Sequence, residues 1–261
     1  MGPQDYLLGG VLAFAVAVVT TPAGVSGAVL LLPVQVSVLH VPSPSLTPTN
    51  LLYNVLATPG ALLRFRHEGR LGSPLTRVLL AGTVPGVVLG AAVRVELLAG
   101  PQAFLLVVAA VLAPLGALLV SGRGVPTARA DPRPSRTVTA YAFGAGLIGG
   151  VYGIGGGSLL GPMLAYLGFS MYAIAPSALT STFVTSVVGV VAYQTLELVK
   201  GDHTIAPEWA LGLSMGVGGV CGSYLGARLQ RRLPETALRR LLGIVCLALA
   251  VRYALQGAGV G

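Results

Sequence analysis

The stretch Gly153-Ile154-Gly155-Gly156-Gly157-Ser158-Leu159-Leu160-Gly161-Pro162 has a second, weaker copy in the same chain. The copy is Gly24-Val25-Ser26-Gly27-Ala28-Val29-Leu30-Leu31-Leu32-Pro33, in which glycine, an apolar residue, small residues, leucines and a proline follow in the same order. The same offset separates the two first glycines and the two prolines. Repetition at a period of half the chain indicates a duplicated unit and not a solenoid of short repeats.

The composition is typical of a membrane protein. Of the 261 residues, 54% are hydrophobic and only 9% are charged, and the mean hydropathy is +0.83. A soluble domain has about 25% charged residues. Residues 6–63 and 137–196 contain no Asp, Glu, Lys or Arg, and each window has room for more than one span of about 20 residues. We therefore predict an all-α, polytopic protein that resides in the lipid bilayer.

Each half of the chain is predicted to contain five helical segments bounded by proline and glycine. They are 6–21, 24–40, 46–64, 75–94 and 101–120, then 138–150, 154–169, 174–196, 208–227 and 236–256. The domains are accordingly a first transmembrane repeat at 1–121, a basic linker at 122–136 and a second repeat at 137–261. The first two segments of each half are short for a bilayer core of ~30 Å. Five spans per half, or three spans plus a broken or re-entrant hairpin, are both compatible with this pattern.

The charged loops predict how the protein is oriented in the inner membrane. Arginines concentrate in 64–77, 121–136 and 228–240, which the positive-inside rule places in the cytoplasm. The acidic loop 197–208 and both termini are predicted to lie outside. Because 64–77 and 197–208 are counterparts of opposite charge, the repeats are predicted to have inverted topology, as in many secondary transporters. The net charge of +8 lies mainly in loops, which argues against a nucleic-acid partner.

The glycine stretches and the polar third segments predict an anion site at the midplane. Helices that begin at these glycines would point backbone N–H groups and a positive dipole end at a ligand. Hydroxyls and amides of the third segments would complete its coordination. Helix packing and interhelical hydrogen bonding are the alternative roles for both sets. The candidate substrate-binding residues are Gly24, Ser26, Gly27, Thr49, Asn50, Asn54, Gly153, Gly155, Gly156, Gly157, Ser158, Thr180, Ser181 and Thr185.

The sequence does not contain the patterns that other chemistries need. Neither uncharged window contains the carboxylate that proton-coupled pumps usually hold in the membrane. The three histidines are scattered and have no cysteine or carboxylate at metal-ligand spacing, and Gly157-Ser158 lacks the elbow motif of hydrolases. We therefore expect no metal, no cofactor and no enzymatic activity. Arg94 and Arg252, near segment ends, are expected to extend toward the membrane surface.

As an ordered set, these motifs resemble the sulfite exporter TauE/SafE family of membrane permeases over nearly the whole chain. The resemblance rests on the two glycine stretches, on Thr49-Asn50-Leu51-Leu52-Tyr53-Asn54 and Leu179-Thr180-Ser181-Thr182-Phe183, and on Pro85-Gly86 with Leu225-Gly226-Ala227. It implies a multi-pass carrier that exports a small sulfur-containing anion, such as sulfite or an organosulfonate, by alternating access. A passive anion channel and a non-transporting scaffold subunit are the alternatives, and a homo-oligomer is compatible with each.

Overall fold

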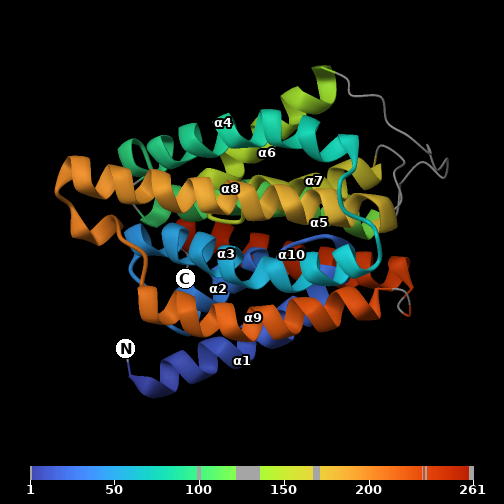
Figure 1. Ribbon diagram of the computed structural model, residues 1–261. Coiled ribbons are helices and arrows are strands. Elements are labelled where there is room, and N and C mark those ends of the chain that lie inside the picture. The colour runs from blue at the N-terminus through green and yellow to red at the C-terminus, as the bar shows by residue number, and fades with distance from the viewer. Residues whose placement is uncertain are drawn as a thin grey trace.

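The part of the chain that the structure describes is helical outside its turns. The computed structural model describes residues 2–98, 101–121, 136–166, 171–230, 232 and 234–258. Within these ranges it has no strand, which confirms the predicted all-α fold, and the linker predicted at 122–136 lies outside them except for Arg136 (Figure 1). The helices are α1 (Pro3–Thr20), η1 (Thr21–Ala23), α2 (Ala28–Ser37), α3 (Ser43–His67), α4 (Pro74–Glu96), α5 (Pro101–Ser121), α6 (Arg136–Tyr152), α7 (Gly156–Tyr166), α8 (Met171–Lys200), η2 (His203–Ile205), α9 (Trp209–Leu229) and α10 (Glu235–Gly257).

Local sequence accounts for several helix starts. Pro3 and Pro74 open α1 and α4, at a position where the missing N–H of proline leaves no helical hydrogen bond unmade. The hydroxyl of Ser73 accepts a hydrogen bond from the Leu75 N–H at 3.2 Å and so caps α4. The start of α4 therefore needs no tertiary contact to specify it.

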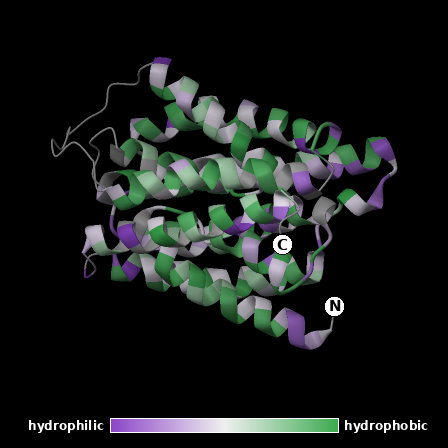
Figure 2. Cartoon of the chain, turned by 180° about the vertical axis from the view of Figure 1, so that it is seen from behind, coloured by the Kyte–Doolittle hydropathy of each residue, from purple (hydrophilic) through white to green (hydrophobic). Residues whose placement is uncertain are grey.

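Four helical stretches of the described chain are long and apolar enough to cross a bilayer, judged by length and composition. They are Pro3–Thr20, Pro74–Glu96, Ile174–Lys200 and His203–Leu229. Hydrophobic residues predominate along the middle of the bundle, and hydrophilic residues gather toward its two ends (Figure 2). This distribution is that of a polytopic membrane protein.

The second helix of each half is short and turns back along the first. α2 has 10 residues and α7 has 11, so they rise only about 15 and 17 Å. Leu39, just after α2, lies against Gly9 near the start of α1. In the same way Gly156 at the start of α7 lies against Gly146 of α6. Each half therefore begins with a hairpin that has one short arm.

The two halves exchange equivalent contacts. α1 packs against α9 as α6 packs against α4, and α3 packs against α9 as α8 packs against α4. Within the halves α2 contacts α3 and α7 contacts α8, while the pairs α3–α8 and α5–α10 join one half to the other. Each of the pairings named here is reproduced when each helix is replaced by its counterpart five helices along the chain. This exchange supports the predicted duplication.

Counterpart helices run in opposite directions. At the start of α3 the Ser45 hydroxyl donates to the Thr204 carbonyl beyond the end of α8, at 3.0 Å. At the other end Arg70, after α3, donates to the carbonyl of Tyr172 at the start of α8. α3 and α8 are therefore antiparallel, and Figure 1 shows the same relation for α4 and α9. Inverted repeats require this arrangement.

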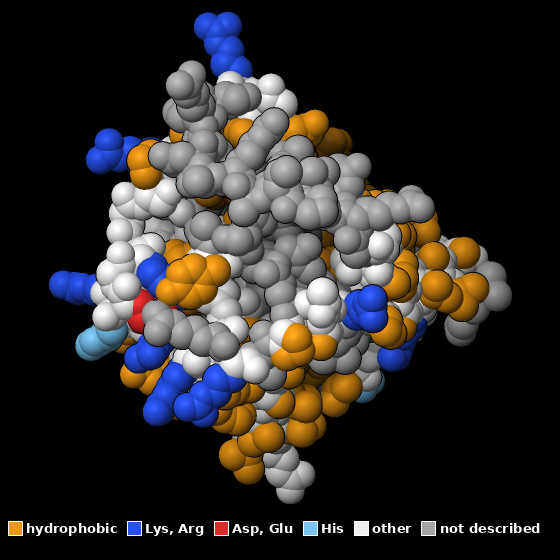
Figure 3. Space-filling view, turned by 90° about the vertical axis from the view of Figure 1, so that its right-hand side faces the viewer, with side chains coloured by type: hydrophobic (Ala, Val, Ile, Leu, Met, Phe, Trp, Pro, Cys, Tyr) orange, Lys and Arg blue, Asp and Glu red, His pale blue; other side chains and the backbone are white. Residues whose placement is uncertain are grey.

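The bundle has two chemically different ends. One, here called the termini end, contains both chain termini and the loop 201–208 (Figure 1). The other, the arginine-rich end, contains the loop 68–73, the end of α5, the start of α6 and the end of α9 (Figure 1). Figure 3 looks onto the arginine-rich end and shows Lys and Arg side chains around its rim with few acidic ones among them. Placement of this end in the cytoplasm stays a prediction.

Arg70 connects three elements at the arginine-rich end. The guanidinium of Arg70 stacks on the Tyr172 ring at 3.4 Å and on the Phe65 ring at 4.6 Å, measured to the ring centroids. It pairs with the Glu68 carboxylate at 3.0 Å and donates to the Gln230 side chain at 3.1 Å. The loop between α3 and α4 is thereby tied to the start of α8 and the end of α9.

Replacing Arg70 with alanine is expected to lower the temperature at which the purified protein unfolds in detergent. The change removes two cation–π contacts and leaves the Glu68 carboxylate, whose side chain is only 5% exposed, with one pairing arginine fewer. We expect a loss of about 2 kcal/mol or more of unfolding free energy. Arg77→Ala, at an exposed position of α4 near the same end, is the control. Equal unfolding temperatures for the two variants would contradict this connecting role.

Candidate functional site

The two glycine stretches form hinges at equivalent positions in the two halves. Gly24 leads from η1 toward α2 with φ +70°, and Gly153 leads from α6 toward α7 with φ +78°. Glycine adopts this left-handed conformation without strain. A Cβ at Gly24 would lie 3.0 Å from the Cα of Ala175 in α8, and one at Gly153 would lie 2.6 Å from the Thr47 carbonyl oxygen in α3. Each hinge therefore packs against the third helix of the opposite half.

The glycines after the second hinge bring α7 close to its neighbours. A Cβ at Gly157 would lie 1.8 Å from the Ala178 carbonyl oxygen and 2.7 Å from the Thr182 backbone nitrogen, both in α8. A Cβ at Gly156 would lie 2.7 Å from the Thr83 side chain in α4. A side chain at Gly157 therefore requires the backbones of α7 and α8 to separate.

The residues that lead into α2 contact the first turn of α7 inside the bundle. The Ser26 N–H donates to Ser158 Oγ at 3.3 Å and joins the two halves. A hydroxyl oxygen accepts the first N–H of each helix: Ser26 Oγ accepts the Ala28 N–H at 3.2 Å, and Thr185 Oγ1 of α8 accepts the Gly156 N–H at 3.1 Å. Helix N-termini present N–H groups and partial positive charge. Two adjacent ones therefore create a region of positive potential without a charged side chain.

Two asparagines of α3 connect this region to both halves. Asn54 accepts a hydrogen bond from the Ser26 hydroxyl, and its amide nitrogen donates to the Gly153 carbonyl at 3.5 Å. Asn50 donates to the Ala28 carbonyl at 2.9 Å. Both asparagine side chains are fully buried. The Asn54 amide thus holds the Gly153 hinge of the second half, and the Asn50 amide holds the first turn of α2 in the first half.

Hydroxyls from α4, α7 and α8 complete the region. Thr83 Oγ1 and Ser181 Oγ are 2.9 Å apart, and Ser158 Oγ and Thr182 Oγ1 are 3.3 Å apart. We call the buried set the central polar layer. Its side chains are those of Ser26, Gln35, Asn50, Asn54, Thr83, Ser158, Ser181, Thr182, Thr185 and Ser186, all of which are buried.

Most of the predicted site residues meet at this layer, but two do not. Thr49 Oγ1 accepts the Glu208 N–H at 2.8 Å and so faces the start of α9. Thr180 Oγ1 donates to the Pro176 carbonyl within its own helix at 2.7 Å and is only partly buried. The other candidates lie at the hinges, in the first turns of α2 and α7, or in the layer.

Four residues of the layer were not among the predicted site residues, namely Gln35, Thr83, Thr182 and Ser186. Thr182 and Ser186 are neighbours of the candidates Ser181 and Thr185 in α8. Gln35 of α2 donates from its amide nitrogen to Asn50 Oδ1 at 3.0 Å, and Thr83 of α4 contacts Ser181. Gln35 is a polar amide in an otherwise apolar segment, which could have marked it. Thr83 is a single hydroxyl in an apolar helix, and such residues are common in membrane helices without functional meaning.

The layer is uncharged but has spare hydrogen-bonding capacity. None of its described side chains is acidic or basic. Ser186 Oγ and Gln35 Oε1 are buried without a hydrogen-bond partner, which is uncommon in folded proteins. A Cβ at Gly155 would lie 2.9 Å from Ser186 Oγ, so this hydroxyl faces the glycine stretch. A small polar ligand or water could be held here by neutral donors alone.

Cavities lie on both sides of the layer. A narrow one, of about 10 Å³, touches Ser26, Gly27 and Tyr53 and continues toward the arginine-rich end past Thr58 and Ala61; it has room for about one water. A second, of about 100 Å³, lies at the termini end. The described side chains of the layer between them are buried.

Comparison with known proteins matches nearly the whole chain to one family. The family described as "Sulfite exporter TauE/SafE" matches residues 9–253. Over 120 residues the chain is 31% identical to the "Probable membrane transporter protein YunE" of Bacillus subtilis (strain 168). That alignment covers 45% of this chain and 41% of the length of the relative. No solved structure matches the chain significantly.

Proposed function

This chain belongs to the sulfite exporter TauE/SafE family, and we propose that it transports a small sulfur-containing anion, such as sulfite or an organosulfonate, across the inner membrane. The relative from Bacillus subtilis is described as a probable membrane transporter, which supports the proposal at the level of transport. In this proposal the protein is a carrier and not an enzyme, the arginine-rich end faces the cytoplasm, and both termini lie outside.

The observation that supports an anionic substrate best is the meeting of two helix N-termini from opposite halves. Ser26, two residues before α2, donates its N–H to Ser158 Oγ in the first turn of α7. Helix N-termini bind anions through their N–H groups and their dipole. In secondary transporters, broken helices place such N-termini at the interface between inverted repeats.

The capping hydroxyls suggest how the anion would be held. In this structure Ser26 Oγ and Thr185 Oγ1 accept the N–H groups of Ala28 and Gly156. These hydroxyl oxygens occupy positions that oxygens of the substrate would take when the layer opens. The asparagine amides and the Ser186 hydroxyl would supply further neutral donors.

Export follows from the membrane potential. An interior-negative potential favours outward movement of an anion by about 2.3 kcal/mol per charge per 100 mV. No coupling ion is then needed, which agrees with the absence of carboxylates from the described part of the layer. Alternating access would open the layer first to the narrow cavity near the arginine-rich end and then to the cavity at the termini end.

Uptake of radiolabelled sulfite into proteoliposomes that contain the purified chain tests the proposal. We expect uptake that saturates with sulfite concentration, and we expect unlabelled sulfoacetate, thiosulfate or sulfate to compete according to their fit to the layer. If none of these anions shows saturable uptake, the result contradicts anion transport by a carrier and favours the scaffold alternative. Uptake that rises linearly with concentration would favour a channel.

Replacing Thr185 with valine is expected to reduce sulfite transport about fivefold to tenfold. The isosteric change removes the oxygen that accepts the Gly156 N–H and so disturbs the start of α7. Thr180→Val is the matched control, because both threonines donate to the carbonyl four residues earlier in α8 but Thr180 lies outside the layer. We expect the control to retain flux within about twofold. Equal losses for the two variants would remove Thr185 from the site.

A further inference from the structure

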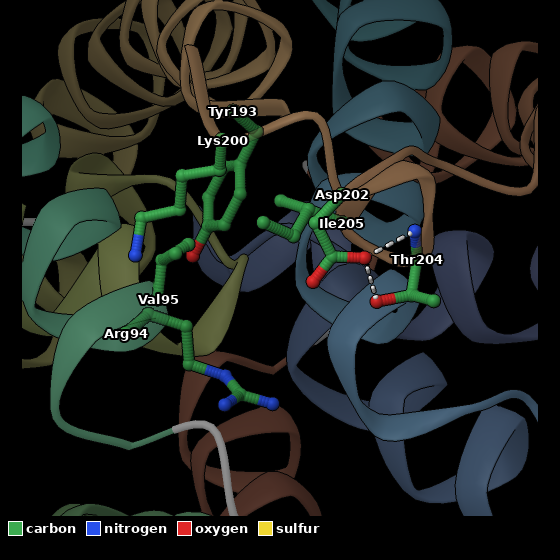
Figure 4. Close-up of a pocket in the computed structure, with 7 residues that line it drawn as sticks. All are labelled: Arg94, Val95, Tyr193, Lys200, Asp202, Thr204 and Ile205. Carbon is green, nitrogen blue, oxygen red and sulfur yellow. Dashed lines mark hydrogen bonds between the residues drawn. The ribbon is translucent and has the colours of Figure 1, made fainter. Parts of the chain in front are cut away.

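The cavity at the termini end has an ionic lining that the central polar layer lacks. It measures about 100 Å³ and lies between the last turns of α4 and α8 and the loop that follows α8. Figure 4 shows the side chains around it. The lining residues are Arg94, Val95, Tyr193, Lys200, Asp202, Thr204 and Ile205.

Arg94 is the buried cation of this cavity. It lies in the last turn of α4, is only 2% exposed, and donates from its guanidinium to the Leu98 carbonyl. Its guanidinium extends beyond the last turn of α4, in the direction predicted for Arg94, but it does not reach solvent, because residues of α8 and the following loop line the same cavity. A guanidinium presents planar, paired donors that match oxyanions.

The other two charges of the lining differ in their effect. Lys200 adds a second cation, although its ammonium also pairs with Glu96 at 2.6 Å. Asp202 accepts hydrogen bonds from the Thr204 N–H at 3.0 Å and hydroxyl at 2.7 Å. These bonds lower the pKa of the Asp202 carboxyl, so it is ionised at neutral pH. It opposes the binding of an anion, but it is exposed to water and thus better screened than Arg94.

The floor of the cavity is connected to the second hinge. Tyr193 is fully buried, and its hydroxyl donates to the Gly150 carbonyl at 2.9 Å. Gly150 lies in the last turn of α6, three residues before the hinge Gly153. A ligand held beside Arg94 and Tyr193 would therefore lie on the route between the central polar layer and the termini end.

We propose that this cavity is an anion-binding vestibule in which Arg94, assisted by Lys200, holds the transported oxyanion as it passes between the central polar layer and the termini end. The inference rests on the proposed function. The single buried guanidinium, opposed by Asp202, gives a site that attracts an anion and still releases it. Removal of the Arg94 charge weakens binding, and removal of the Asp202 charge strengthens it.

The test compares the KM and maximal rate of labelled sulfite uptake for four forms of the full chain. We expect Arg94→Gln to raise the KM about tenfold and Asp202→Asn, which keeps an oxygen for the Thr204 bonds, to lower it about threefold. Arg252→Gln removes a charge from an exposed position near the end of α10 and is the control. Opposite KM shifts with similar maximal rates would support the vestibule.

Two results would overturn the vestibule, and they differ from failure of the proposed function. If Arg94→Gln and Asp202→Asn both keep the KM of the unaltered chain, the vestibule is wrong while anion transport stands. If Arg94→Gln fails to fold, the change in KM of Asp202→Asn alone tests the vestibule: a lower KM supports it, and an unchanged KM overturns it. If the unaltered chain shows no uptake, the proposed function is contradicted. The vestibule is then tested by measuring whether sulfite raises the unfolding temperature of the purified protein. A rise that is larger for Asp202→Asn supports the vestibule, and no rise overturns it.

Discussion

Replacing Gly157 with alanine is expected to reduce sulfite transport at least about tenfold while the protein still inserts and folds. The added Cβ would lie 1.8 Å from the Ala178 carbonyl oxygen, so α7 and α8 must separate to accommodate one methyl group. Overpacking of this kind costs about 1–3 kcal/mol. A loss of about 1.4 kcal/mol in the transport barrier corresponds to a tenfold slower rate. The expected effect falls on the first turn of α7, where the anion would be held.

Gly144→Ala is the matched control for this prediction. Gly144 lies in α6, and no atom lies within 4 Å of the Cβ that alanine would add there. The control should keep uptake within about twofold of the unaltered chain. Detergent-solubilised protein should elute as a single species for both variants. Undiminished uptake by Gly157→Ala would show that close packing of α7 on α8 is not needed for transport.

Replacing Asn54 with aspartate is expected to reduce sulfite transport at least about a hundredfold. The change keeps the size of the side chain, but it replaces the amide donor to the Gly153 carbonyl with an oxygen and can add a negative charge to the layer. At an effective dielectric constant of 20, two like charges 4 Å apart repel by about 4 kcal/mol. That repulsion exceeds the ~2.8 kcal/mol of a hundredfold change.

Gln102→Glu makes the same chemical change at an exposed position near the start of α5 and serves as the control. We expect its uptake to match that of the unaltered chain. The comparison uses initial rates at equal amounts of reconstituted protein. Uptake by Asn54→Asp equal to that of Gln102→Glu would mean that no anion approaches Asn54, and the central polar layer would lose its proposed role.

The elements of this fold were predictable because their signals are local. Pro74 and Ser73 mark a helix start through the backbone chemistry of those residues, and long apolar windows indicate membrane helices whatever surrounds them. The hinge at Gly153 was predictable as a break because glycine runs interrupt helices. The sequence also predicts that the second segment of each half is short. The structure adds that α2 and α7 have only 10 and 11 residues, and that the residues leading into α2 contact the first turn of α7.

The site was predictable only in part, because it depends on which face of a helix meets which neighbour. Thr49 and Asn50 are adjacent in sequence and therefore about 100° apart around α3. Asn50 faces α2, whereas Thr49 faces the start of α9. Thr83 enters the layer because α4 packs against α8, and Arg94 is buried because a loop over a hundred residues later covers it. Such contacts arise from tertiary packing and leave no local mark.

The most direct test of the carrier account is counterflow. Uptake of labelled sulfite is measured in proteoliposomes that contain either buffer or excess unlabelled sulfite inside. The account predicts that internal sulfite accelerates the initial uptake of label, because a loaded carrier returns its central site to the outside, and that Gly157→Ala abolishes the acceleration. Uptake that internal sulfite does not accelerate would contradict alternating access at the central polar layer.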